Sequence, residues 1–109
     1  MIRRGDIILC ALQGDYGKPR PAVVVQTDIV NETHESITLC PLTTHLIDAS
    51  LFRISILPGK QSGLKQTSQV MVDKITSQKR VKLREKIGEL TIDQLKKINA
   101  ALRFWQDLN

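Results

Sequence analysis

The hydrophobic positions of the chain fall into short runs separated by turn residues, a pattern typical of small β-proteins. Most runs are rich in β-branched residues, and the one from Phe52 to Ile56 alternates apolar and polar positions, as a strand with one buried face does. Pro21 can open a strand but cannot occupy a central position, because it has no N–H to donate. The pattern predicts strands at 7–12, 22–25, 36–42, 52–56 and 68–75.

The C-terminal segment has the periodicity of a helix. Thr91 and Gln94 have the spacing of a capping box, in which both side chains satisfy free backbone amides at a helix start. Apolar residues then recur every three or four positions, and the resulting stripe must be covered by the sheet or by a second subunit. The stripe consists of Ile92, Leu95, Ile98, Leu102 and Trp105. The segment 78–89 is mixed and basic, and its pattern favours no element.

Several short strands followed by one helix predict a mainly β fold, a small and strongly bent sheet or barrel with a C-terminal helix. The length of 109 residues, with 41% hydrophobic and 25% charged residues, is that of one folded domain spanning residues 1–109. No run approaches the roughly 20 apolar residues of a membrane-spanning helix, and no signal-peptide pattern is visible. Cys10 and Cys40 are expected to be buried thiols in a reducing compartment. We therefore expect a cytoplasmic protein with no membrane association.

The net charge of +5 is distributed unevenly. Residues 1–53 carry a net charge of −1, whereas residues 54–109 carry +6. A basic half attracts phosphate backbones, because each neutralised phosphate releases condensed counterions. The same lysines and arginines would serve equally well as a solvated surface, so charge alone does not decide between the two interpretations.

Common catalytic and metal-binding motifs are absent from the sequence. There is no GxSxG, CxxC or HExxH pattern and no glycine-rich phosphate loop after a strand. His34, His45 and the two cysteines are not paired at a chelating spacing. We therefore expect neither a metal site nor a cofactor.

Three segments carry residues suited to chemistry on a phosphate. Arg20 stands between two prolines, which restrict the backbone that presents its guanidinium. The planar guanidinium carries several hydrogen-bond donors and suits a phosphate that gains charge. An arginine in such a loop is, however, commonly a surface residue. Thr43 and Thr44 end a strand, where hydroxyls usually bond local backbone groups. Asp73 could be a solvated carboxylate, a partner of Lys74 or Arg80, or a base.

The order of these segments resembles the MazF/PemK family of toxins. The resemblance runs from Arg4 to about Leu108, and it rests on the order and spacing of its motifs, since no single motif is specific. The motifs are Gly5-Asp6-Ile7, Arg20-Pro21-Ala22-Val23-Val24-Val25, Pro41-Leu42-Thr43-Thr44, Gly63-Leu64, Ser68-Gln69-Val70-Met71-Val72-Asp73-Lys74-Ile75 and Ile87-Gly88-Glu89-Leu90-Thr91.

The resemblance implies an SH3-like barrel with a C-terminal helix, a two-fold homodimer, and sequence-selective cleavage of single-stranded RNA without a metal. It also implies a cognate antitoxin whose disordered tail lies across the active groove. Arg20 occupies the position of the family's catalytic arginine, and Thr43 that of its catalytic threonine or serine. Asp73 falls where some members, such as the Kid toxin, have a catalytic aspartate. Those members also have an arginine two positions earlier, where this chain has Met71. The neighbouring residues expected to contact RNA are Lys18, Thr44, His45, Lys65, Gln66, Ser68 and Lys74.

The expected reaction is attack of a ribose 2′-OH on the adjacent phosphate, which leaves a 2′,3′-cyclic phosphate and a 5′-OH. The attacking group is already in place, so the reaction requires a base, an acid and donors to the phosphate oxygens. Arg20 is assigned to charge stabilisation, with acid catalysis as the role that the family suggests, and Thr43 to hydrogen bonding of the phosphate. The base stays open between Asp73, which the resemblance favours, and His45, because imidazole groups exchange protons near neutral pH.

The loop before Arg20 departs from the family pattern. Many members have a longer loop there that helps to cover RNA, whereas this chain has only the seven residues from Gln13 to Pro19. The shorter loop puts base specificity and the mode of antitoxin binding in question. Tyr16 could stack on a base, although a turn tyrosine more commonly packs on its own loop.

Two other functions are compatible with the same fold. CcdB-type toxins poison DNA gyrase through a C-terminal Trp-Gly-Ile, but here Trp105 is followed by Gln106 and is in register with the apolar stripe. A non-catalytic RNA- or DNA-binding SH3-like module is the second alternative. Phosphate binding alone would not require both the Arg20-Pro21 pair and the threonines after Leu42, which favours the nuclease.

Overall fold

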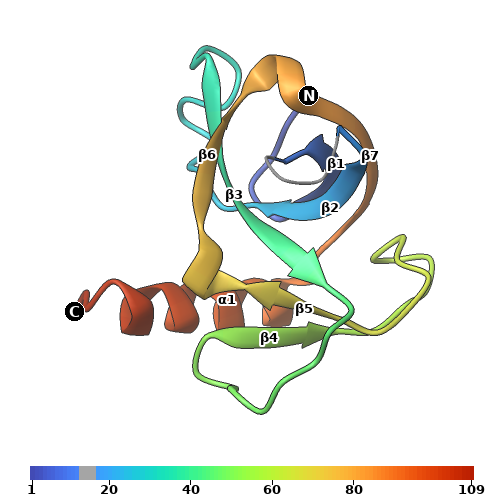
Figure 1. The fold of residues 1–109 in the computed structure, drawn as a ribbon. Helices are drawn as coiled ribbons and strands as arrows, with labels where there is room; N and C mark the ends of the chain where they lie inside the picture. The colour runs from blue at the N-terminus through green and yellow to red at the C-terminus, as the bar shows by residue number, and fades with distance from the viewer. Residues whose placement is uncertain (13–16) are drawn as a thin grey trace.

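The computed structural model describes residues 1–12 and 17–109, so the proposed stacking role of Tyr16 lies outside the described residues. Seven strands, two short 3₁₀ helices and one α-helix make up the described chain (Figure 1). In chain order they are β1 (Asp6–Ala11), β2 (Pro19–Val24), β3 (Ser36–Thr43), β4 (Arg53–Ile56), β5 (Ser68–Met71), η1 (Val72–Lys74), β6 (Thr76–Lys79), η2 (Arg80–Lys82), β7 (Leu83–Glu89) and α1 (Ile92–Trp105).

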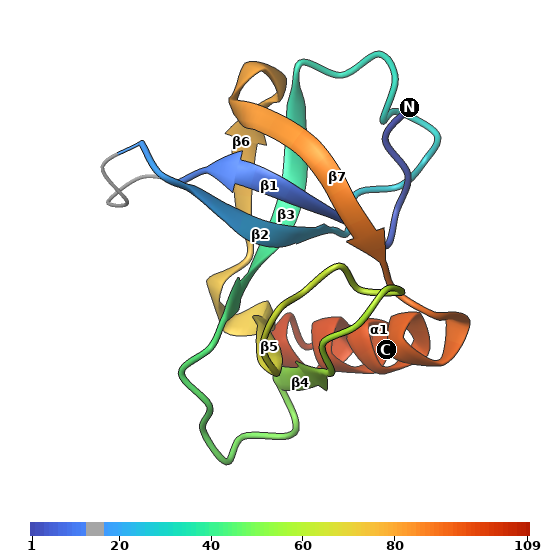
Figure 2. The ribbon, with the colours of Figure 1, turned by 90° about the vertical axis from the view of Figure 1, so that its right-hand side faces the viewer.

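The strands form one antiparallel, strongly bent sheet. Its order is β4-β5-β3-β2-β1-β7, and β6 pairs with the first half of β3. Helix α1 lies beside β4 and β5 at one end of this sheet (Figures 1 and 2). Within the described ranges no pairing joins β7 to β4. The predicted mainly β fold with a C-terminal helix is confirmed, in the form of an open sheet and not a closed barrel.

The predicted strand over 68–75 is interrupted. Its first part is β5, η1 follows, and the chain then resumes pairing with β3 as β6. Between the pairs Leu42–Val70 and Leu39–Thr76, β3 advances three residues while its partner advances six. The extra residues are accommodated by η1. The strand predicted over 68–75 therefore ends at Met71 and pairing resumes at Thr76, although Val70 and Val72 are both buried in the same apolar cluster.

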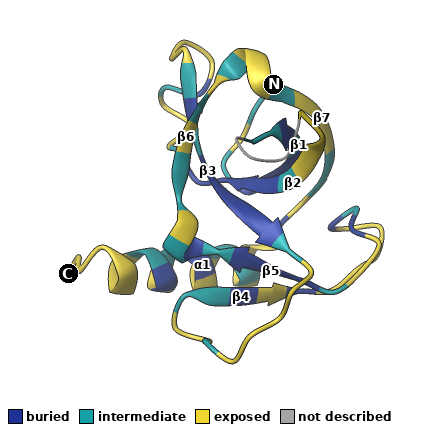
Figure 3. Cartoon of the chain, in the orientation of Figure 1, coloured by how far each residue is buried: buried dark blue, intermediate teal, exposed yellow. Residues whose placement is uncertain are grey.

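Two apolar clusters lie on opposite faces of the central strands. On β2, Val23 belongs to the cluster that contacts α1, whereas Ala22 and Val24 belong to the other cluster. This alternation follows from the two-residue period of a strand. Cys10 and Cys40 are buried, as predicted. The buried positions follow the central strands and the inner side of the helix, while much of the connecting loops is exposed (Figure 3).

The helix begins as predicted and buries a narrower stripe than predicted. The Thr91 hydroxyl accepts a bond from the Gln94 amide, and the Gln94 side chain accepts one from the Thr91 amide. Ile98 and Ala101 are the buried positions. Ile92, at the first turn, is 75% exposed, because it precedes the part of the helix that meets the sheet. Trp105, at the last turn, is 45% exposed and contacts Phe52 with its ring centre 5.3 Å away.

Pro21 lies within β2, which starts three residues before the predicted boundary. It pairs with Leu9 of β1, but the pairing of β2 with β3 covers only the three residues from Ala22 to Val24. One edge of β2 is therefore unpaired at Pro21, a position where a proline is tolerated. No helix in the described part of the chain is long and apolar enough to cross a membrane.

Candidate active site

Arg20 and Thr43 are brought together by the register of β2 and β3. Ala22 pairs with Pro41 at the last rung between these strands. Continuing that register outward by two residues places Arg20 opposite Thr43, where the strands no longer pair. Both residues line one hollow of about 300 Å³. The two residues therefore share a surface although 22 positions separate them in the sequence.

The walls of this hollow combine polar groups with apolar ones. Thr44 and Ser68 also face it, and Leu12, Pro41 and Met71 supply apolar contacts. A few polar groups among apolar ones are the usual composition of a site that orients a bound molecule.

A second hollow of about 520 Å³ adjoins the first. Arg20, Pro21, Thr44 and Ser68 line both, so the two form one continuous groove, named here the Arg20 groove. The second hollow adds Lys18, Lys65 and Gln66, which the sequence analysis assigned to RNA contact. Among the described residues that line the groove, three are cationic and none is acidic. The groove is suited to a polyanion.

The Thr43 side chain is held in a specific orientation. Its Oγ1 accepts a hydrogen bond of 3.1 Å from the backbone amide of His45. This is the local backbone bond that was expected for a strand-end hydroxyl, and it is compatible with a role in binding. Because a hydroxyl has one proton and two lone pairs, accepting from His45 leaves the proton available to a group in the groove.

Asp73 lies in η1 and forms an ion pair with Arg53 of β4. Its two carboxylate oxygens accept from Nε and Nη2 of Arg53 at 2.7 and 3.0 Å. The hydrogen bond from Arg53 is the main reason why the pKa of Asp73 is lowered from 3.8, and the same bond raises the pKa of Arg53. From the sequence, Lys74 and Arg80 were the partners considered for Asp73. The partner in the structure comes from the neighbouring strand, where Arg53 pairs with Met71.

Not every residue predicted for the site lines the groove. Lys74 and Asp73 lie in η1, and neither they nor His45 are among the lining residues described. His45 is nevertheless attached to the groove through the bond between its amide and Thr43. The predicted residues that do line it are Arg20, Thr43, Lys18, Thr44, Lys65, Gln66 and Ser68.

The loop that carries Lys65 and Gln66 lies in close backbone contact with β7, and two glycines permit this contact. A Cβ on Gly63 would lie 1.8 Å from the Ile87 carbonyl oxygen, and one on Gly88 would lie 2.1 Å from that of Ser62. Gly63 also has a φ of +71°, which side chains rarely adopt. The two backbones can therefore touch only because both positions lack a side chain, and this contact fixes one wall of the groove.

Sequence reasoning missed two polar residues beside the site, Arg53 and Gln69. Gln69 is buried on β5 and bonds the backbone of Ile47 through both ends of its amide, at 3.1 and 2.9 Å. Nothing in the sequence pairs Gln69 with Ile47 or Arg53 with Asp73. A polar residue at the centre of the Ser68–Met71 strand was the available signal, because such residues are buried only when they are bonded.

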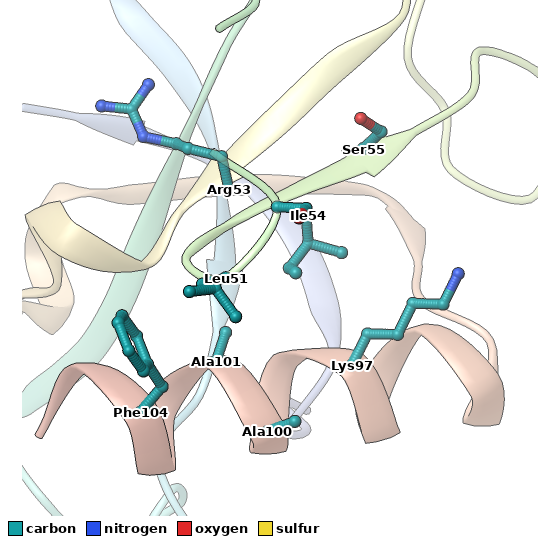
Figure 4. Close-up of a pocket in the computed structure, with 9 residues that line it drawn as sticks. Leu51, Arg53, Ile54, Ser55, Lys97, Ala100, Ala101 and Phe104 are labelled. Carbon is teal, nitrogen blue, oxygen red and sulfur yellow. The ribbon is translucent and has the colours of Figure 1, made fainter. Parts of the chain in front are cut away.

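A separate hollow of about 450 Å³ lies between β4 and α1. Figure 4 shows Leu51, Ala101 and Phe104 around it, with Lys97 at one side and the Arg53 guanidinium pointing away from the helix. Leu51 and Phe104 are 62% and 51% exposed. This surface is mainly apolar and contains none of the predicted catalytic residues.

The two cysteines are not suited to nucleophilic chemistry. Burial raises the pKa of the Cys40 thiol to about 12, and burial also raises that of Cys10. Both thiols are therefore protonated at neutral pH. Among residues 1–12 and 17–109 no group of three or more His, Cys, Asp and Glu side chains is arranged to hold a metal ion.

Comparisons with known proteins identify the relatives of this fold and sequence. Residues 3–105 match the profile of a family described as PemK-like, MazF-like toxins of type II toxin–antitoxin systems. The probable endoribonuclease MazF of Mycolicibacterium smegmatis is 40% identical over 102 residues, which cover 93% of each chain. The Mycobacterium tuberculosis toxin MazF-mt6 has a TM-score of 0.83 at 22% identity, over 95% of this chain and 98% of its own. An endoribonuclease from a mycobacterial species, solved in complex with its cognate antitoxin, has a TM-score of 0.85 at 24% identity, over 100% of this chain and 98% of its own.

Proposed function

This chain belongs to the PemK/MazF family of type II toxin–antitoxin toxins and is an endoribonuclease, and from that premise we propose that it cleaves single-stranded RNA in the Arg20 groove. The observation that carries the proposal is that Arg20 and Thr43 line the same hollow. The adjoining cations Lys18 and Lys65 support it, because they extend a positive surface along which a phosphate backbone can lie.

The proposed reaction breaks the bond between a phosphorus and the 5′-oxygen of the next nucleotide. The ribose 2′-oxygen attacks the phosphorus and gives up its proton to a base, and the departing 5′-oxygen receives a proton. The products carry a 2′,3′-cyclic phosphate and a 5′-OH. Arg20 donates to the non-bridging oxygens as they gain charge, and the proton of the Thr43 hydroxyl holds the phosphate in position.

We assign the base to His45 in preference to Asp73. Both carboxylate oxygens of Asp73 are engaged by Arg53, and its lowered pKa makes it a weaker proton acceptor. His45 follows Thr44 directly, is exposed, and has its amide bonded to Thr43. A base on this turn can approach a phosphate that is bound at Thr43. In this proposal Asp73 maintains the structure behind the groove.

We propose that the other residues predicted to contact RNA bind different parts of the strand. Thr44 and Ser68 face both hollows and are proposed to contact the nucleotides on either side of the cleaved bond. Gln66 is proposed to bind a base and Lys65 a phosphate in the second hollow. Lys74 is proposed to act only on RNA that extends past the groove toward η1.

The same reasoning extends to partners. We propose that residues 1–109 act as a single toxin domain in the cytoplasm, as a homodimer that a cognate antitoxin neutralises by covering the Arg20 groove. Leu51 and, on α1 itself, Phe104 are large exposed apolar side chains, and they support a contact between subunits because neighbouring exposed apolar groups commonly mark an interface. The antitoxin found with a structural relative supports a partner of that class.

The gyrase-poisoning alternative has less support. It requires a Trp-Gly-Ile segment presented to a partner, whereas Trp105 contacts Phe52 of its own chain and is followed by Gln106. A non-catalytic module would bind RNA in the same groove, so only the products distinguish it from a nuclease.

The experiment that tests the proposal is incubation of the purified protein with end-labelled single-stranded RNA in excess EDTA. We expect fragments that end in a 2′,3′-cyclic phosphate and begin with a 5′-OH. A shifted but intact RNA would establish the binding module instead. Inhibition of DNA supercoiling without RNA cleavage would establish the gyrase poison.

A further inference from the structure

Gln69 is a buried polar residue whose side chain forms two hydrogen bonds with the backbone of Ile47. It is 7% exposed, its Oε1 accepts from the Ile47 amide at 3.1 Å, and its Nε2 donates to the Ile47 carbonyl at 2.9 Å. These two bonds copy one rung of an antiparallel sheet. Ile47 is thereby attached to β5 although it belongs to no strand.

The position of Gln69 connects this clamp to the groove. On β5 it stands directly opposite Thr43 of β3. The segment from Thr43 to Ile47 is consequently fixed at three points: by sheet pairing at Thr43, by the bond from the His45 amide to Thr43 Oγ1, and by Gln69 at Ile47. Thr44 and His45 lie between these points and are exposed. Without the clamp, the bond from the His45 amide to Thr43 Oγ1 would be the one remaining side-chain bond within this turn, among the hydrogen bonds of the described residues.

We propose that Gln69 is a positioning residue for cleavage, which holds the turn after β3 so that the His45 amide keeps the Thr43 hydroxyl oriented toward Arg20. The inference rests on the proposed function for its kinetic consequence, whereas the clamp itself is independent of it. Only an amide fits this role, since Ile47 offers one donor and one acceptor. A methionine has a similar shape and replaces neither bond.

The first test compares Gln69→Met with Gln78→Met. Gln78 lies on β6 and bonds Thr76 at 3.2 Å, away from the groove residues, so it controls for the exchange of a glutamine amide for a thioether. At a temperature where both variants are folded, we expect single-turnover cleavage by Gln69→Met to fall about 10–100-fold, as misplacement of a catalytic group does. The KM should stay within about threefold, because the groove still binds phosphate. Gln78→Met should cleave like the wild type.

A second test separates positioning from a general loss of stability. In a Thr43→Val background, Gln69→Met should reduce cleavage by no more than about threefold further, because Gln69 acts through Thr43. Full additivity of the two losses would overturn the proposal, as would wild-type cleavage by Gln69→Met.

Amide hydrogen exchange tests the clamp without RNA. We expect faster exchange at Ile47 and His45 in Gln69→Met, with unchanged protection in β1 and β2. Unchanged protection at Ile47 would overturn the clamp. If the wild type itself does not cut RNA, the proposed function fails and this measurement still decides whether Gln69 holds the turn.

Discussion

The Oγ1 of Thr43 lies 3.1 Å from the backbone nitrogen of His45 and accepts its hydrogen bond. One bond therefore links the residue proposed to hold the phosphate with the residue proposed to take the proton. Because a hydroxyl has one proton and two lone pairs, Thr43 can accept this bond and still donate to a phosphate. The following predictions test this arrangement and the structure that supports it.

Replacing Thr43 by valine keeps the shape of the side chain and removes both its accepted and its donated bond. We expect Thr43→Val to lower single-turnover cleavage by about 10–100-fold, in line with the loss of one hydrogen bond to a charged group. Thr43→Ser retains the hydroxyl and should cleave within about threefold of wild type. Wild-type cleavage by Thr43→Val would mean that the hydroxyl does not act on the phosphate, because valine keeps the methyl group and lacks the hydroxyl.

Removal of the Arg20 guanidinium should abolish most cleavage and leave the fold intact. We expect Arg20→Ala to reduce the rate by about 10²–10³-fold, the effect of losing one preorganised donor. Arg103→Ala is the matched control, because it removes the same charge from an exposed position on α1. If Arg103→Ala reduced cleavage as much as Arg20→Ala, general attraction by the net charge would explain the result.

The choice of base should be visible in the effect of replacing His45. Glutamine can still form hydrogen bonds but cannot act as a base, so His45→Gln should lower the single-turnover rate of cleavage by about 100-fold or more. Asp73→Asn, at a temperature where it is folded, should cleave within about tenfold of the wild type. The reverse result would assign the base to Asp73.

The Arg53–Asp73 pair should contribute to stability at neutral pH. Their side chains are 9% and 16% exposed, so Asp73→Asn leaves a largely buried guanidinium without its charged partner. We expect the free energy of unfolding to fall by about 1–3 kcal/mol, or roughly 4–8 °C in Tm per kcal/mol for a domain of this size. Urea unfolding of the wild type and of Asp73→Asn, followed by circular dichroism, measures the difference in the free energy of unfolding.

The direction in which pH changes the stabilisation by the Arg53–Asp73 pair follows from the lowered pKa of Asp73. The folded chain holds the Asp73 proton less tightly than the unfolded chain, whose carboxyl has an ordinary pKa of 3.8. The stabilisation is therefore present above that value and is lost as the pH falls through the lower folded-state pKa. The difference between wild type and Asp73→Asn should shrink in unfolding experiments well below pH 3.8. A constant difference would contradict the ion pair.

The contact of Gly63 with β7 should be specific to glycine. A methyl group there would meet the Ile87 carbonyl, whereas one on Gly59, which also has a positive φ, would meet nothing within 4 Å. Gly63→Ala should therefore be less stable than Gly59→Ala by about 1–3 kcal/mol. Equal stability, measured by thermal unfolding, would show that the loop can move away from β7.

The local elements could be predicted because their causes lie within a few residues. The capping box of Thr91 and Gln94 requires only a three-residue spacing, and the strand at Phe52–Ile56 requires only alternation. The break after Met71 was not predictable in this way. In the sequence, Val72 continues the alternation of Val70. The 3₁₀ helix η1 takes up the residues by which the segment from Val70 to Thr76 is longer than the part of β3 that it follows.

For the site, the resemblance to the MazF/PemK family pointed to Arg20 and Thr43, and the sequence by itself supplied their local settings: a backbone restricted by two prolines and a hydroxyl at a strand end. Their meeting depends on the Ala22–Pro41 register, which pairing across the sheet establishes. The tertiary structure alone decided that Arg53 binds Asp73 and that Gln69 holds Ile47, each about 20 residues away. Spacing along a chain determines which face a side chain takes, but only the packing of distant strands determines what that side chain meets.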